Sequence, residues 1–195
     1  MTSSPSPAVP VLNIANVLTV VRILLVPFFV WFLLLDDGSD GLFRWLAVLV
    51  FVVAIYTDKL DGDLARSRGL ITDFGKIADP IADKLLIGSA LIMLSVLGEL
   101  WWWVTIVILV REIGITLLRF AVIRYGVMPA SRGGKLKTVV QTVAILLFLI
   151  PLQSVAGAWA WWPAAAVMAA AVVITVVTGI DYVVQAIRLR AAARS

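Results

Sequence analysis

Long apolar runs dominate this chain of 195 residues and limit what it can fold into. Hydrophobic residues make up 62% of the sequence, whereas ordinary soluble domains have roughly 45–50%. A helix needs about 20 residues to cross the hydrocarbon core of a bilayer. We therefore expect an all-α integral membrane protein, a bundle of six transmembrane helices. The six runs are 17–35, 42–56, 77–97, 101–118, 139–151 and 163–187.

Basic residues fall in alternate connections between these runs, and this pattern predicts the orientation of the chain. Cytoplasmic connections of membrane proteins are rich in Lys and Arg, while Trp gathers at the membrane interfaces. The connections without basic clusters are the Trp-rich ones. We therefore expect a multi-pass protein of the cell (inner) membrane with both termini in the cytoplasm. The basic residues are Arg66, Arg68, Arg124, Arg132, Lys135, Lys137, Arg188, Arg190 and Arg194.

The organisation along the chain is simple. We expect one transmembrane domain at 13–190, with cytoplasmic tails at 1–12 and 191–195. The first tail is rich in Ser and Pro and is expected to be disordered. No basic residue precedes Arg22 and no cleavage signature follows a short apolar core, so no signal peptide is expected.

The chain has no Cys and no His, which narrows its chemistry. Disulfides, structural zinc sites and His-based catalysis are excluded. Any catalysis must use carboxylates, Lys or Arg, hydroxyl groups, or a cation bound by oxygen atoms.

Six aspartates and several basic residues gather in one segment, 57–84. We expect the second helix to end near Ser67 and the third to begin near Thr72, where Thr72 or the following Asp offers an N-cap. Positions at equal distance from the intervening turn then lie at the same depth.

In this arrangement Asp61 mirrors Asp79, and Asp58 lies within one residue of mirroring Asp83. The members of each helix's pair are three or four residues apart, so each pair lies on one helix face. Four ionised carboxylates so close would repel one another unless a cation neutralised them. Oxygen ligands alone favour Mg²⁺, Mn²⁺ or Ca²⁺ over zinc, and two metals suit displacement at phosphorus.

The alternative is a solvated loop in which these aspartates pair with neighbouring Lys and Arg residues. Depth argues against it, because Asp83 lies about 17–20 Å along the helix from the turn.

The pattern D-x2-D-G-x2-A-R-x8-G-x3-D-x3-D is complete in this segment. It resembles the signature of the CDP-alcohol phosphatidyltransferases, which are six-helix membrane enzymes that work as homodimers. The residues at the fixed positions are Asp58, Asp61, Gly62, Ala65, Arg66, Gly75, Asp79 and Asp83.

The resemblance implies a role for each of these residues. The four aspartates would hold two Mg²⁺ or Mn²⁺ ions that bridge the CDP diphosphate. The nucleotide would be contacted by Asp61 and by the small and basic positions between the aspartates. Asp83 would be the general base that deprotonates the incoming alcohol, which then attacks the lipid-bearing phosphorus and expels CMP. The nucleotide-contacting positions are Asp61, Gly62, Ala65, Arg66 and Gly75.

Two flanking stretches bear on the acceptor alcohol. Residues 13–27 and 111–141 resemble the corresponding parts of the bacterial phosphatidylglycerophosphate synthases, whose acceptor is glycerol 3-phosphate. Independently, a phosphorylated acceptor requires cations near the site. We hypothesise that Arg119, Lys135 and Lys137 bind its phosphate, with Arg111 held by Glu112 or by a neighbouring helix.

Each of these assignments has an alternative. The lysines could reach the interface from a helix end, and Arg111 and Glu112 could form a structural ion pair. Glu112 and Arg119 share a helix face, so they could pair with each other. Arg22 could reach the interface or contact the phosphates of the donor.

Other functions stay open from the sequence. Cardiolipin synthase and phosphatidylinositol-phosphate synthase of the same family also use the aspartate motif. A small cation transporter is a different class, but it predicts further ionisable residues across the membrane, and none stands between Leu85 and Gly98. No nucleic-acid partner is expected.

Overall fold

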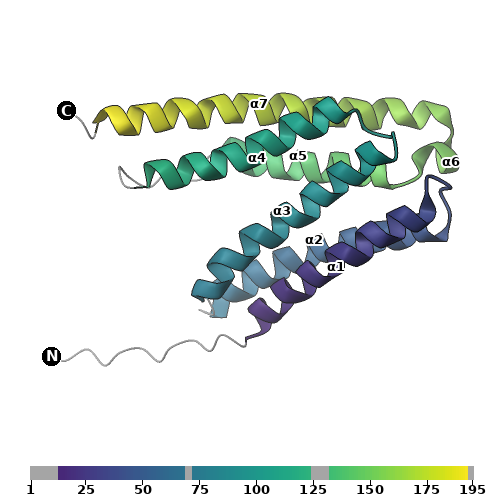
Figure 1. Ribbon diagram of the computed structural model, residues 1–195, viewed down its shortest axis with the longest axis horizontal. Helices are drawn as coiled ribbons and strands as arrows, with labels where there is room; N and C mark the ends of the chain where they lie inside the picture. The colour runs from purple at the N-terminus through teal and green to yellow at the C-terminus, as the bar shows by residue number, and fades with distance from the viewer. Residues whose placement is uncertain (1–12, 69–71, 124–131, 193–195) are drawn as a thin grey trace. The chain divides into compact units, whose positions relative to one another are not determined.

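The computed structural model describes residues 13–68, 72–123 and 132–192, and within these ranges it contains helices and no strand. The prediction of an all-α chain is therefore confirmed. Six long helices match the six apolar runs (Figure 1). The elements are α1 (Ile14–Asp36), α2 (Leu42–Arg68), α3 (Asp73–Val96), α4 (Trp102–Val122), α5 (Arg132–Leu149), α6 (Leu152–Ala156), the 3₁₀ helix η1 (Ala158–Ala160) and α7 (Trp161–Ala192).

Two helical stretches of the described residues are long and apolar enough to cross a membrane, Ile14–Asp36 and Ala158–Ala191. They fit a membrane protein. The helices α2, α3, α4 and α5 also have 18 residues or more, but charged side chains interrupt each of them. The number of six spans therefore stays a prediction.

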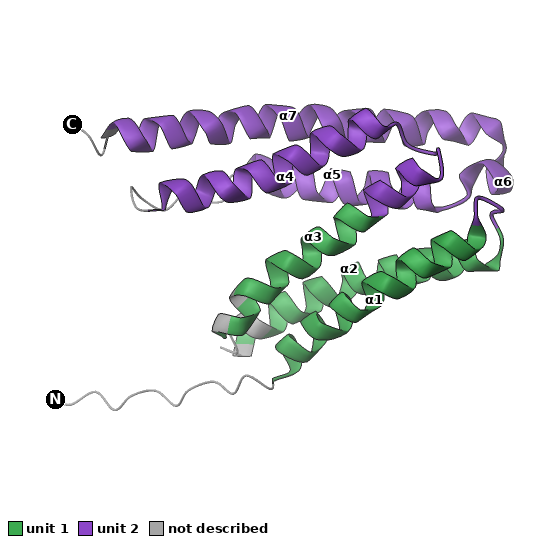
Figure 2. Cartoon of the chain, in the orientation of Figure 1, with its two compact units in different colours: residues 1–36, 41–89 green, residues 37–40, 90–195 purple. Residues whose placement is uncertain are grey.

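The chain divides into two compact units, residues 1–36 with 41–89, and residues 37–40 with 90–195 (Figure 2). In unit 1, α1 and α2 pack along each other. Phe29 and Leu33 of α1 and Phe51 of α2 are completely buried. The rings of Phe29 and Phe51 lie 5.8 Å apart between centroids. This apolar contact holds α1 in place beside the helix that carries the first aspartates.

Side chains cap the starts of α1 and α3. Asn13 Oδ1 accepts a hydrogen bond from the backbone N–H of Asn16 at 3.0 Å. Thr72 Oγ1 accepts one from the backbone N–H of Gly75, also at 3.0 Å. Each cap satisfies a backbone N–H that the helix itself leaves without a partner. The predicted N-cap at Thr72 is confirmed, and the helix ends at Arg68 and Asp73 differ from the predicted ones by one residue.

In unit 2, α4 and α5 both pack against α7. Ile115 and Val122 of α4 form a buried cluster with Tyr182 and Ala186 of α7. At the opposite end of α4, Ser95 and Thr105 share a hydrogen bond of 2.7 Å between their hydroxyl oxygens. These contacts fix the rotation of α4, which carries Arg111, Glu112 and Arg119 (the acidic and basic residues of its central and last turns).

The expected tails fall mostly outside the described residues. Residues 1–12 and 193–195 are not described, and neither is the turn at 69–71 or the connection 124–131, which contains Arg124. The single domain at 13–190 stays a prediction.

Candidate functional site

The four motif aspartates lie in unit 1, two on α2 and two on α3. Asp61 is buried, with 4% of its surface exposed, whereas the side chain of Asp58 is 48% exposed. The carboxylates of Asp58 and Asp79 lie close enough to Asp61 to interact electrostatically with its carboxylate. Asp61 of α2 and Asp79 of α3 are therefore near one another in the folded chain. Asp83 is one turn further along α3 and is partly exposed.

A polar stripe on α1 contacts these carboxylates. It consists of Asn16, Thr19 and Arg22, which are spaced three residues apart and are 5%, 1% and 0% exposed. The guanidinium of Arg22 forms ion pairs with both Asp58 and Asp61 through two different nitrogens. Thr19 Oγ1 donates a hydrogen bond of 2.6 Å to Asp79 Oδ1. The aspartates of both helices are thus joined to one face of α1.

The first turn of α3 approaches the same stripe. The side-chain amide of Asn16 donates from Nδ2 to Thr72 Oγ1 at 2.8 Å. A Cβ atom at Gly75 would stand 2.9 Å from Asn16 Oδ1 and 3.7 Å from Asp79 Oδ2. Real Cβ atoms essentially never come as close as the first of these distances. Gly75 is therefore required here for the close approach of α1 and α3.

Sequence reasoning left Arg22 unassigned and did not single out Asn16 or Thr19. The available signal was the three-residue spacing of polar residues in an otherwise apolar run, which places all three on one helix face. The remaining motif residues are less informative. Gly62 is half-buried, and the side chains of Ala65 and Arg66 lie outside the described residues.

The donor chemistry at this place fits a hard divalent cation, because the side chains that meet here offer carboxylate and hydroxyl oxygens. The residues that would hold it are Asp58, Asp61, Asp79 and Asp83. In the part of the chain that the structure describes, no three acidic side chains are close enough to form a complete metal-binding group. The metal site therefore stays a proposal.

The residues predicted to bind the acceptor phosphate lie in unit 2, on α4 and α5. Lys137 is buried and forms an ion pair with Glu112. Arg111 contacts the same carboxylate oxygen, donating to Glu112 Oε1 at 3.2 Å, and also donates to Thr178 Oγ1 of α7 at 3.0 Å. Arg111 is thus held both by Glu112 and by a neighbouring helix, the two arrangements that the sequence left open.

Arg119 and Lys135 are both exposed. Arg119 donates to the hydroxyl of Tyr182 at 2.9 Å, and its guanidinium lies over the Tyr182 ring, 4.9 Å from the centroid. Glu112 is paired with Arg111 and Lys137. The pairing of Glu112 with Arg119 that their shared helix face allowed is not what the described structure shows.

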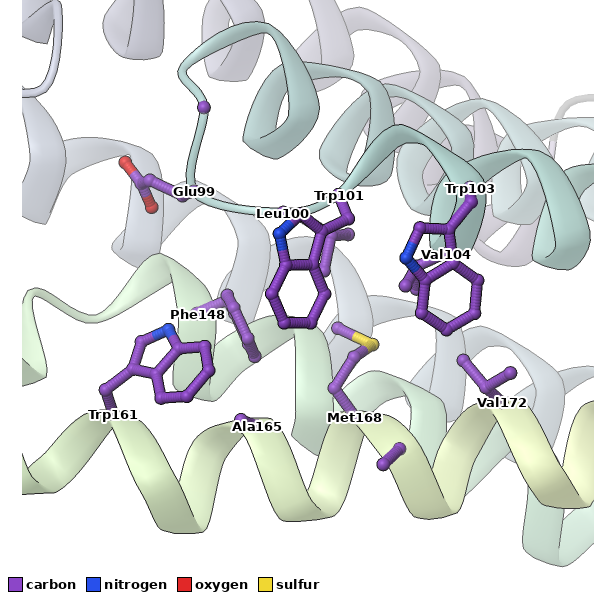
Figure 3. Close-up of a pocket in the computed structure, with 12 residues that line it drawn as sticks. Glu99, Leu100, Trp101, Trp103, Val104, Phe148, Trp161, Ala165, Met168 and Val172 are labelled. Carbon is purple, nitrogen blue, oxygen red and sulfur yellow. The ribbon is translucent and has the colours of Figure 1, made fainter.

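A cavity of about 170 Å³ lies in unit 2 at the Trp-rich start of α4. Figure 3 shows Trp101, Phe148 and Trp161 among the side chains around it. None of the residues predicted for nucleotide, metal or acceptor binding is in its lining. Its wall is mainly aromatic and aliphatic, so it is not a site for the charged chemistry of the motif.

Comparison with known proteins gives a match over nearly the whole chain. Residues 12–185 match the family model described as CDP-alcohol phosphatidyltransferase. A "Probable phosphatidylglycerophosphate synthase" of Mycobacterium tuberculosis is 54% identical over 176 residues, which is 90% of this chain and 82% of that protein.

More distant relatives carry a related description. A "CDP-diacylglycerol--glycerol-3-phosphate 3-phosphatidyltransferase" of Bacillus subtilis is 36% identical and covers 87% of this chain and 93% of its own length. A protein of Escherichia coli with the same description is 37% identical over 70% of this chain and 76% of its own length.

Proposed function

Because this chain belongs to the CDP-alcohol phosphatidyltransferase family, we propose that it transfers the phosphatidyl group of CDP-diacylglycerol to the 1-hydroxyl of sn-glycerol 3-phosphate. The products are phosphatidylglycerophosphate and CMP, and the chain is an enzyme of phospholipid biosynthesis. The observation that carries the choice of acceptor is the 54% identity, over 90% of the chain, to a relative described as a phosphatidylglycerophosphate synthase.

The contacts in unit 1 support a role for the aspartates in holding the CDP diphosphate. Asp58, Asp61, Asp79 and Asp83 would hold the divalent cations, Mg²⁺ or Mn²⁺ and two per site. When bound, these ions would supply positive charge to the diphosphate and to the departing CMP. Asp61, Gly62, Ala65, Arg66 and Gly75 contact the nucleotide, and Gly75 leaves room where α1 and α3 come together.

Asp83 acts as the general base. It takes the proton of the acceptor hydroxyl, whose oxygen forms a bond to the lipid-bearing phosphorus. The bond from that phosphorus to the oxygen of CMP breaks, and CMP leaves with the electron pair. The partial exposure of Asp83 suits this role, because the acceptor is water-soluble and must reach the carboxylate.

The acceptor phosphate is bound by Arg119, Lys135 and Lys137, with Arg111 as part of the same basic group. The exposure of Arg119 and Lys135 supports contact with a soluble anion. Glu112 supports Lys137 and Arg111 by its ion pairs.

The proposed setting follows from the pattern of basic residues. The enzyme is a multi-pass protein of the cell membrane, with a single transmembrane domain at 13–190, short tails at 1–12 and 191–195, and both termini in the cytoplasm. Family membership, rather than the basic residues, supports the proposal that it works as a homodimer. The membrane supplies the lipid donor, and the cytoplasm supplies the acceptor.

The experiment is an assay of CMP release by the purified chain in detergent with CDP-diacylglycerol and Mg²⁺. Glycerol 3-phosphate, inositol 1-phosphate and phosphatidylglycerol are offered as separate acceptors. Release is expected with glycerol 3-phosphate alone, and is lost with EDTA and in Asp83→Asn. Asp63→Asn is the matched control, because Asp63 is an exposed aspartate of α2 outside the motif pattern. Release with another acceptor would overturn the proposed acceptor, and release with none would overturn the proposed function.

A further inference from the structure

The strongest unexplained feature is Arg22, an arginine of an apolar helix that is 0% exposed. A fully buried guanidinium must leave water, and its partners offset that cost only in part. Replacing such ion pairs by apolar residues of similar size is often neutral or stabilising. A buried arginine is therefore weak evidence of a stabilising role, and its function must be sought in the groups it contacts.

Those groups are two of the motif aspartates. One nitrogen of the guanidinium contacts Asp58 Oδ1 and the other contacts Asp61 Oδ2. The two carboxylates differ in environment, since the side chain of Asp58 is 48% exposed and that of Asp61 is 5% exposed. Arg22 thus joins a buried and an exposed carboxylate of the same helix face from a neighbouring helix.

The ion pairs with Asp58 and Asp61 do not use every hydrogen-bond donor of the Arg22 guanidinium. Arg22 Nε is buried and has no hydrogen-bond partner in the described structure. The two other nitrogens of the guanidinium contact the carboxylates, and the Nε hydrogen has no acceptor among the described residues.

The charges of the neighbouring side chains indicate what the contact between Arg22 and the two aspartates does. The carboxylate of Asp61 interacts electrostatically with the negative charges of Asp58 and Asp79 and with the positive charge of Arg22. Carboxylates this close repel each other, and a nearby cation reduces the repulsion.

We propose that Arg22 is a built-in counter-ion of the aspartate site, which pairs with Asp58 and Asp61 and sets how tightly the site takes up a divalent cation. This inference rests on the proposed function in taking these aspartates as cation ligands. Arg22 contributes one positive charge permanently, so that a divalent ion is held firmly enough to act but not at the full strength of four uncompensated carboxylates.

The proposal predicts opposite effects on cation binding and on stability when the charge is removed. In Arg22→Met the carboxylates lose their counter-ion, so the apparent Kd for Mn²⁺ should fall by about tenfold or more, because a positive charge no longer opposes the incoming ion. The unfolding temperature in EDTA should fall, and the rise on adding Mn²⁺ should be larger than in the wild type. Arg22→Lys keeps the charge but offers one nitrogen in place of two, so its Kd should lie between the wild-type value and that of Arg22→Met.

The test measures the Mn²⁺ Kd from the electron paramagnetic resonance signal of the free ion, and thermal unfolding with and without Mn²⁺, for the full-length chain in detergent. Arg44→Met is the matched control. Arg44 is also a buried arginine of unit 1, but it stands 14 residues before Asp58 on α2, roughly 20 Å along the helix. This control should lower the unfolding temperature equally with and without Mn²⁺ and leave the Kd unchanged.

The inference is overturned if Arg22→Met leaves the Mn²⁺ Kd unchanged or weakens binding, or if its unfolding temperature shifts by the same amount in both conditions. If that variant does not fold, Arg22→Gln, which is neutral but polar, is measured in its place under the same criteria. A wild-type chain that binds no Mn²⁺ also overturns it. Failure of the proposed function is seen separately, as an absence of CMP release from the wild type with every acceptor.

Discussion

Thr19 of α1 donates a hydrogen bond of 2.6 Å to Asp79 of α3, although the two residues are 60 positions apart in the chain. The backbone carbonyl of Ala15 is also within reach of this hydroxyl, at 3.1 Å. A hydroxyl has one proton, and the charged acceptor at the shorter distance forms the stronger bond. Thr19 therefore fixes the orientation of a motif aspartate from outside the motif.

Substitution of Thr19 by Val tests this relationship, because Val keeps the branched shape and removes the donor. A hydrogen bond to a charged group contributes about 1.5–3 kcal/mol. If the bond is needed to orient Asp79, kcat for CMP release should fall by about tenfold to a hundredfold. Thr116→Val is the control, since the Thr116 hydroxyl bonds only a backbone carbonyl of its own helix among the contacts described, that of Glu112. Equal activity of the two variants would contradict the role of Thr19.

Gly75→Ala tests the close approach of α1 and α3. Ala is favoured over Gly in a helix by about 1 kcal/mol, but here its Cβ would stand 2.9 Å from Asn16 Oδ1. Overpacking of this kind costs about 1–3 kcal/mol, so we expect Gly75→Ala to lower the unfolding temperature and to reduce CMP release.

The double substitution Asn16→Ala with Gly75→Ala separates the steric effect from a loss of nucleotide contact. With the Asn16 amide removed, adding the methyl group at Gly75 should no longer lower stability, and helix propensity should make it neutral or stabilising. A methyl group that costs the same stability in both backgrounds would show that Asn16 is not the obstacle.

The helix ends on either side of the turn in segment 57–84 were predictable from the sequence because their determinants are local. Thr72 marks the start of the third helix as its N-cap, and the spacing of the aspartates places them on one face of each helix. The observed helix ends at Arg68 and Asp73 lie one residue from the predicted ones at Ser67 and Thr72. The partners of Arg22 were not predictable in the same way. They lie 36 and 39 residues away. The spacing of the polar residues marks one face of α1, but it does not specify which helix that face meets.

The same limit applies to α4. Sequence spacing placed Glu112 and Arg119 on one face, but helix-face arguments do not include the neighbouring helices. In the folded chain α5 brings Lys137 to Glu112, and α7 brings Tyr182 to Arg119. The partners of these charged residues are decided by packing between helices, and their role in acceptor binding stays a prediction.

Lys135 offers the cleanest test of acceptor binding, because it is exposed. An exposed lysine away from buried networks usually contributes within about 0.5 kcal/mol to stability. Lys135→Ala should therefore leave the unfolding temperature unchanged, and should raise the KM for glycerol 3-phosphate by about tenfold if the side chain binds the acceptor phosphate. Measuring the KM for CDP-diacylglycerol beside it shows whether the effect is confined to the acceptor. An unchanged KM for glycerol 3-phosphate would remove Lys135 from the phosphate site.

Lys137 should behave differently, because it is buried and paired with Glu112. Removing one member of a buried ion pair leaves the other charge without compensation, which costs about 3–5 kcal/mol when no other partner remains. Glu112 keeps its contact with Arg111, so a smaller loss of about 1–3 kcal/mol is expected for Lys137→Met. Thermal unfolding and acceptor KM are measured for this variant and for the double variant Lys137→Met with Glu112→Gln.

The double variant shows whether Lys137 supports the fold or contacts the substrate. Because Glu112→Gln also removes the carboxylate that pairs with Arg111, the double variant should be no more stable than Lys137→Met. If Lys137 binds the acceptor phosphate, the KM for glycerol 3-phosphate should be raised equally in both variants, whatever the difference between their unfolding temperatures. A KM that rises further in the double variant as the unfolding temperature falls further would mean that Lys137 acts only through the packing of α4 against α5.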